Sequence, residues 1–114
     1  MKPGAQAEQT AARFLQRQGL LLVQANYRCR FGEIDLILRD GDTLVFAEVR
    51  LRSRSDFGGA AASIDAHKQA KLIRAAQHYL AGLPHTPPCR FDALLLVSPD
   101  GKGGIEWLKN AFGL

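Results

Sequence analysis

The feature that most constrains the fold is a pair of alternating segments on either side of a tight-turn signal. Residues 33–38 and 45–52 place apolar side chains at every second position, and this period of two is typical of β-strands. The dipeptide Asp40-Gly41 lies between them and is a strong signal for a short hairpin connection. The sequence therefore predicts an antiparallel β-hairpin in the middle of the chain.

The remaining periodicities surround this hairpin with helices and further strands. Apolar residues at helical spacing, followed by glycine, predict one helix near the N-terminus and a second helix after the hairpin. The expected elements are a helix over 4–18, a strand over 20–28, the hairpin, a loop over 53–63, a helix over 65–80, a buried central strand over 90–97, and a short strand or helical turn over 105–112. This α-β-β-β-α-β order predicts an α/β (α+β) fold in a single domain, residues 1–114.

Composition sets the broad class of protein. A chain of 114 residues with 46% hydrophobic and 23% charged residues is expected to form one globular domain. No apolar run approaches the ~20 residues that a membrane span needs, and the N-terminus lacks a secretory core, so we expect a cytoplasmic protein without a membrane partner. The net charge of +4 is only a weak indication of a nucleic-acid partner.

Acidic residues gather on the predicted hairpin. Glu33 and Asp35 are two residues apart, so they share one face of their strand. With a turn at residues 40–41, Glu33 lies opposite Glu48 and Asp35 lies diagonally from it. With a turn at residues 41–42, Asp35 and Glu48 become direct partners. Either register collects carboxylates on one face.

Opposed like charges destabilise a sheet unless something neutralises them. One remedy is a bound hard cation, since carboxylate oxygens suit Mg²⁺ or Mn²⁺. The other is solvation together with salt bridges to Arg50 and Arg52, which follow Glu48 on the second strand. Spacing alone leaves both remedies open.

The motifs around the hairpin carry a resemblance to a known family. The segment GEIDLI, followed after a turn by VFAEVRLR, resembles the YraN family of bacterial proteins, which is related to archaeal Holliday-junction resolvases and to the PD-(D/E)XK nuclease superfamily. The likeness covers nearly the whole chain; it extends to AEQTAARFL, Asn26-Tyr27-Arg28, FGGAAASIDAHKQAKL, CRFDALLL and IEWLKNAF. It implies a restriction-endonuclease-like core, in which helices flank a central mixed sheet.

The resemblance also implies roles for individual residues. Asp35 matches the first metal-binding carboxylate, and Glu48 matches the acid of the D/E-x-K motif. The backbone carbonyl of Val49 is then expected to face the same Mg²⁺ or Mn²⁺ ion. Glu8 matches a helix-borne acid that supports the cluster. Arg50 replaces the usual lysine; because arginine stays protonated, it can orient water or stabilise phosphate charge but cannot act as a base.

The function that the resemblance implies is metal-dependent hydrolysis of DNA phosphodiesters, with branched or structured DNA as the substrate class. Arg52, Lys68 and Gln69 are the expected nucleic-acid contacts beside the catalytic residues. By analogy with resolvases, we expect a homodimer. Two alternatives are a non-catalytic nucleic-acid-binding module that retains the fold, which Arg50 favours, and a protein-interaction domain.

Overall fold

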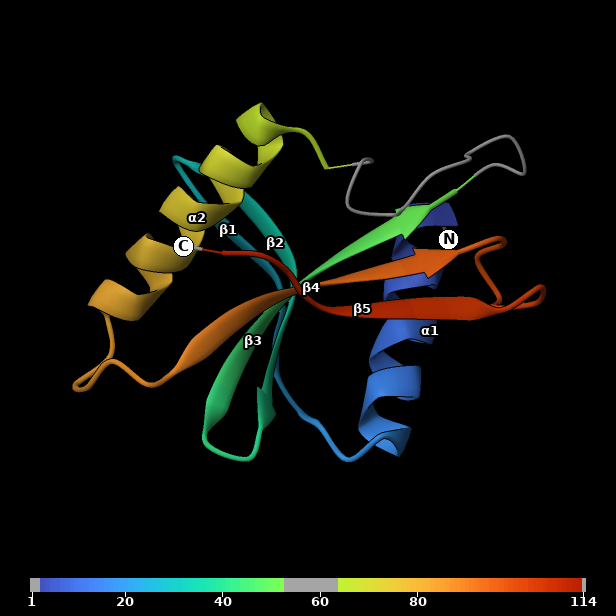
Figure 1. The fold of residues 1–114 in the computed structure, drawn as a ribbon, viewed down its shortest axis with the longest axis horizontal. Coiled ribbons are helices and arrows are strands. Elements are labelled where there is room, and N and C mark those ends of the chain that lie inside the picture. Colours follow the sequence, from blue (N-terminus) through green and yellow to red (C-terminus); the bar gives the residue numbers. More distant parts are fainter. Residues whose placement is uncertain (1–2, 53–63, 114) are drawn as a thin grey trace.

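The strands of the protein form one mixed sheet in the order β1-β2-β3-β4-β5 (Figure 1). The computed structural model describes residues 3–52 and 64–113, so the expected loop over 53–63 lies outside the described residues. The elements are α1 (Pro3–Arg17), β1 (Leu21–Cys29), β2 (Gly32–Asp40), β3 (Thr43–Leu51), α2 (Ala66–Ala81), β4 (Cys89–Leu96) and β5 (Ile105–Phe112). The predicted fold class and element order are confirmed, and the final segment is a strand.

Strand directions follow from the connections between the strands. β1, β2 and β3 are joined by tight turns and run antiparallel, whereas β3 and β4 run parallel because the crossover that contains α2 connects them. Asp40 pairs with Thr43 across the β2–β3 connection. The turn therefore occupies residues 41–42, which is the second of the two registers considered above.

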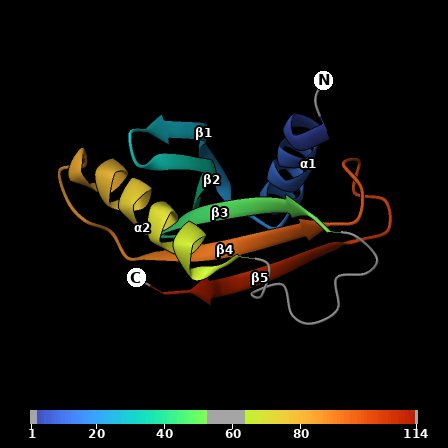
Figure 2. The ribbon, with the colours of Figure 1, turned by 90° about the horizontal axis from the view of Figure 1, so that it is seen from above.

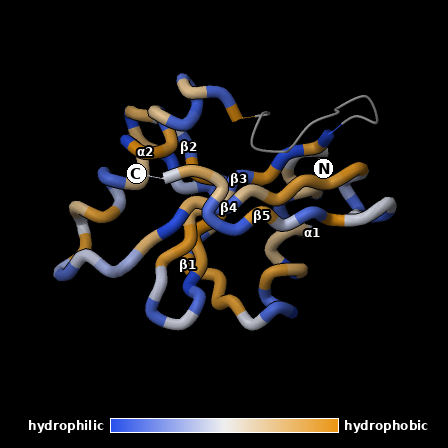
Figure 3. Tube along the Cα trace, viewed as in Figure 1, coloured by the Kyte–Doolittle hydropathy of each residue, from blue (hydrophilic) through white to orange (hydrophobic). Residues whose placement is uncertain are grey.

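Each helix covers its own face of the sheet. Alternate residues of β2, β3 and β4 point to opposite sides and form two separate apolar cores, one under α1 and one under α2. Figure 1 shows the two helices on opposite sides of the sheet, Figure 2 shows α2 beside the β1–β2 hairpin, and Figure 3 shows hydrophobic residues concentrated along the central strands. Neither described helix has the length and apolar character needed to span a membrane.

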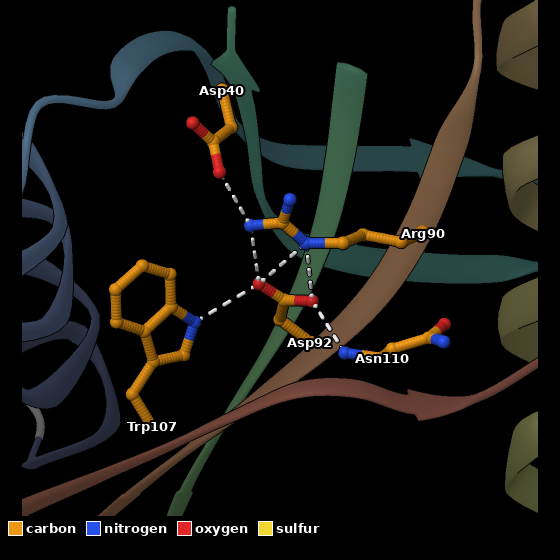
Figure 4. Close-up of polar contacts among 5 residues, drawn as sticks. All are labelled: Asp40, Arg90, Asp92, Trp107 and Asn110. Carbon is orange, nitrogen blue, oxygen red and sulfur yellow. Dashed lines mark hydrogen bonds and ion pairs between the residues drawn. The ribbon is translucent and has the colours of Figure 1, made fainter.

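The buried carboxylate of Asp92 connects β4 and β5 at one side of the sheet (Figure 4). Asp92 on β4 is fully buried and accepts hydrogen bonds from Arg90 Nε at 3.0 Å, Trp107 Nε1 at 2.9 Å and the Asn110 backbone N–H at 3.0 Å. Arg90 also reaches Asp40 at the β2–β3 turn, 2.9 Å away. Because every partner is satisfied, this network has a structural role: it joins β4, β5 and the hairpin turn.

Candidate functional site: an acidic cluster where two strands separate

The site begins where the ladder between β2 and β3 ends. The last paired residues are Leu36 and Ala47, so Asp35 and Glu48 are not the direct partners that a turn at 41–42 predicts. Beyond the ladder, the side chain of Asp35 takes the place of a strand partner. Its Oδ2 accepts a hydrogen bond of 2.8 Å from the backbone N–H of Val49. Ile34 packs in the core under α2, whereas Leu36 packs in the core under α1. The alternation of side chains between the two faces of β2 is therefore interrupted at Asp35. This residue is held between the two strands where they separate.

Three carboxylates converge at this point. Oxygens of Glu8, Glu33 and Asp35 all lie within 4.8 Å of one another. Glu8 reaches the cluster from α1 because its neighbours Ala7 and Ala11 are buried against the sheet. Carboxylate oxygens at such spacing are the donor set that hard divalent cations take.

The electrostatics of the cluster favour a compensating positive charge. Burial, which is the largest cause, and the charges of Glu48, Glu8 and Glu33 together raise the pKa of Asp35 from its ordinary value of 3.8 to about 8, against the opposing effect of the Val49 N–H. The pKa of Glu8 is also raised, first by burial. The charges of Glu33 and Glu48 add to the shift in Glu8, while side-chain hydrogen bonds with Asn26 and Asp35 oppose it.

Glu48 on β3 lies near the cluster, and its side chain contacts the start of α2. It is only 6% exposed, and its Oε1 lies 2.7 Å from Nζ of Lys68 at the start of α2. The position of Lys68 is set locally, since Asp65 caps the helix by accepting a 2.8 Å hydrogen bond from the Lys68 backbone N–H. Glu48 therefore acts on Asp35 through its charge and is itself paired with a lysine.

The other predicted site residues have different surroundings. Arg50 is half-buried two residues beyond Glu48. Arg52 forms an ion pair of 2.7 Å with Glu106 on β5. Gln69 donates from Nε2 to the carbonyl oxygen of Ile64 at 2.8 Å, so its side chain stabilises the start of α2.

The structure thus brings Glu8, Asp35 and the Val49 backbone together and places Glu48 nearby with Lys68. It adds Glu33, to which the sequence interpretation assigned no role. The strand spacing that puts Glu33 and Asp35 on one face was the available signal for it. The contact of Val49 with the cluster runs through its N–H, whereas the sequence interpretation invoked its carbonyl.

The donor set of this site fits a divalent ion of the Mg²⁺ class. All three converging groups supply oxygen, and burial together with the charges of the neighbouring acids keeps the pKa of Asp35 high when no cation balances it. A five-stranded mixed sheet with two flanking helices, and acids at the point where two inner strands separate, is compatible with a nuclease-like α/β core.

Comparison with known proteins identifies the family within this class. The chain belongs to the family described as "Uncharacterised protein family UPF0102", whose model matches residues 7–96. It is 62% identical over 109 residues to a UPF0102 protein of Nitrosomonas europaea, covering 96% of this chain and 92% of the relative. It is 56% identical over 114 residues to a UPF0102 protein of Cupriavidus metallidurans, covering 99% and 82% respectively. The resemblance to the YraN-like family is therefore confirmed.

Proposed function

We propose that the protein is a metal-dependent endonuclease that hydrolyses phosphodiester bonds in DNA, with branched or structured DNA as its substrate. The observation that carries this proposal is the convergence of Glu8, Glu33 and Asp35 within 4.8 Å, where β2 and β3 separate. A cluster of acids that costs stability in the metal-free protein is accounted for by a function that needs it.

Each residue has a role that its surroundings support. Asp35, Glu8 and Glu33 would hold Mg²⁺ or Mn²⁺, and Glu48 would add a further carboxylate once Lys68 moves from it. The bound ion would lower the pKa of a coordinated water and neutralise charge that develops on the phosphate. Asp35 releases its proton when it becomes a ligand. The always-protonated guanidinium of Arg50 would stabilise phosphate charge.

The direct test of cleavage is a panel of labelled four-way junction, flap, single-stranded and duplex DNA with Mn²⁺ or Mg²⁺. Asp35→Asn and Glu48→Gln serve as inactive variants, since each keeps the shape of the side chain and removes its charge. We expect cleavage by the wild type that both variants lose. Equal cleavage by the wild type and by Asp35→Asn would reveal a contaminating nuclease and contradict the proposal.

Metal binding is tested separately from cleavage. Titration of Mg²⁺ into ¹⁵N-labelled protein is expected to shift the amide signals of Asp35, Glu48 and Val49. The Val49 N–H is the most sensitive reporter, because it donates directly to Asp35 Oδ2. No localised shift at millimolar Mg²⁺ would refute the metal site.

A second candidate function is a nucleic-acid-binding module that retains the fold without cutting. Two observations favour it: Lys68 occupies the carboxylate of Glu48 at 2.7 Å, and Arg50 stands in place of the motif lysine. Binding that weakens steeply with salt, without cleavage of any substrate in the panel, would support it. The homodimer and the cytoplasmic location stay predictions, and sedimentation with and without junction DNA tests the first.

A further inference from the structure

The exposed flank of α2 carries an unbroken row of basic residues. His67, Lys71, Arg74 and His78 follow one another at intervals of three and four residues, so they lie on one side of the helix. All four are exposed, and Figure 3 shows hydrophilic positions along this helix. The sequence from 66 to 81 contains no aspartate or glutamate.

This arrangement costs helix stability. Lys71 and Arg74 are like charges three residues apart and repel one another, where an ordinary exposed helix gains from acid–base pairs. The acids near the N-terminus of α2 lie outside this row, since Asp65 caps the helix and Glu48 pairs with Lys68. A pair of exposed cations, flanked by two histidines and without an acid on the same helix, is accounted for if an anionic partner binds to it.

The β1–β2 turn extends the same surface. Cys29 pairs with Gly32, so Arg30 and Phe31 form a two-residue turn. A Cβ added to Gly32 would lie 3.8 Å from the Cβ of Lys71, which shows that the turn packs directly on α2 (Figure 2).

Aromatic contacts fix the two elements together. The ring centroids of Phe31 and His78 are 5.9 Å apart, and the Arg30 guanidinium lies 4.8 Å from the Phe31 ring centroid. The hydroxyl of Tyr27 hydrogen-bonds with Nδ1 of His78. The row on α2, Arg30 of the turn and Arg28 near the end of β1 therefore form one surface. It is here named the basic face: Arg28, Arg30, His67, Lys71, Arg74 and His78.

The basic face contacts the acidic cluster at one point and lies beside a residue that approaches the cluster at a second. Arg28 Nε lies 3.6 Å from a carboxylate oxygen of Glu33, which is itself part of the cluster. At the start of α2, Lys68 follows His67 and contacts Glu48. An anionic polymer lying along the basic face would therefore reach the acidic cluster.

We infer that the basic face binds the sugar–phosphate backbone of DNA and leads the strand to the acidic cluster. From His67 to His78 the helix extends about 17 Å, which corresponds to roughly five nucleotides of one strand. This inference deepens the proposed function and rests on DNA as its substrate. It assigns the principal backbone contacts to Lys71 and Arg74, and it does not use Arg52 or Gln69, which contact Glu106 and the Ile64 carbonyl.

The test compares two double variants of equal charge. Lys71→Gln/Arg74→Gln removes two cations from the basic face, and Arg13→Gln/Arg17→Gln removes two exposed cations from α1. Binding to fluorescein-labelled 15-nucleotide single strands, 15-base-pair duplexes and four-way junctions is measured by anisotropy in EDTA over a salt series. Circular dichroism checks that both variants are folded.

We expect the first variant to lower the slope of log affinity against log salt by about 1.4 for single strands or about 1.8 for duplexes. Affinity near 0.1 M salt should fall roughly 10- to 100-fold, while the α1 variant stays close to the wild type. Equal losses in both variants, or no loss in the first, would overturn the inference. Binding only to vesicles that contain phosphatidylserine, and not to DNA, would overturn it as well.

Cleavage assays with Mn²⁺ on the same substrates separate this inference from the proposed cleavage. If the Lys71/Arg74 variant loses binding while the wild type cuts no substrate, the basic face stands and the endonuclease proposal fails. If the wild type cuts DNA and the Lys71/Arg74 variant binds and cuts equally well, the endonuclease proposal stands and the basic face fails.

Discussion

Replacing Asp35 with asparagine should stabilise the metal-free protein at neutral pH. The asparagine Oδ1 can still accept the hydrogen bond from the Val49 N–H, so the backbone contact survives. What disappears is a carboxylate whose pKa is raised from 3.8 to about 8 by burial and by Glu48, Glu8 and Glu33. The variant removes the repulsion and leaves the hydrogen-bond geometry in place.

The magnitude follows from the raised pKa. An acid with a raised pKa in the folded state contributes stability that is complete below its unfolded pKa of 3.8 and is lost as the pH rises through about 8. At about 1.4 kcal/mol per pKa unit, the loss near pH 7.5 reaches an upper bound of about 5 kcal/mol. Solvent and proton sharing among the neighbouring acids reduce it, so we expect about 2–5 kcal/mol near pH 7.5 and about 1–2 kcal/mol near pH 5.

Urea unfolding of both proteins in EDTA, from about pH 5 to pH 8, measures this difference. Asp42→Asn at the exposed hairpin turn is the control, and its effect should stay within about 0.5 kcal/mol. Addition of Mg²⁺ at about 100 times its dissociation constant should stabilise the wild type by about 2.7 kcal/mol and leave Asp35→Asn unchanged. A variant no more stable than the wild type at pH 7.5, or a difference that does not grow with pH, would refute the electrostatic account of the site.

Three further changes test separate parts of the structure. Lys68→Met removes the cation beside Glu48, so the Mn²⁺ affinity measured by calorimetry should rise about fivefold. The reason is that repulsion between two charges about 4 Å apart in water is worth about 1 kcal/mol. An unchanged affinity would contradict this. Asp92→Ala leaves buried donors without an acceptor and should cost about 3–5 kcal/mol in urea unfolding, whereas a loss under 1 kcal/mol would show that the network is unimportant. Gly101 has a positive φ of 86°, which alanine adopts only with strain, so Gly101→Ala should lower the stability by about 1–3 kcal/mol. Gly4 lies in the open first turn of α1, so Gly4→Ala should raise the stability by up to about 1 kcal/mol. Thermal melts of the two variants measure both effects.

Local patterns predicted the elements well, and long-range contacts decided what they left open. Helical spacing indicated both helices, alternation indicated β2 and β3, and apolar runs indicated β1 and β4. The hairpin register was undecided because turns at 40–41 and 41–42 both contain Gly41. The structure has the turn at 41–42, where Asp40 pairs with Thr43 and its carboxylate contacts Arg90, fifty residues away. The segment 105–112 was ambiguous because Asn110 has a positive φ of 56°, which breaks the period of the strand.

Some features of the candidate site also follow from local sequence patterns, whereas others depend on long-range contacts. The shared face of Glu33 and Asp35 follows from strand spacing alone. Glu8 entered only through the family resemblance, since its approach depends on how α1 packs on the sheet. The contact of Lys68 with Glu48 depends on the crossover between β3 and β4 and on the cap at Asp65. No local sequence pattern predicts either the approach of Glu8 or the contact between Lys68 and Glu48.

The irregular outer strands have a consequence for how the molecules behave in concentrated solution. An open sheet has two free edges, and a flat free edge invites a strand from another molecule. Here β1 contains Asn26 and β5 contains Asn110, each with a φ of 56°, and each edge ladder shifts register once. Such kinks make an edge a poor template for further strands. This protection matters most at β1, where Leu21 is 66% exposed, because a kinked edge opposes the pairing of this apolar strand with a strand of another molecule.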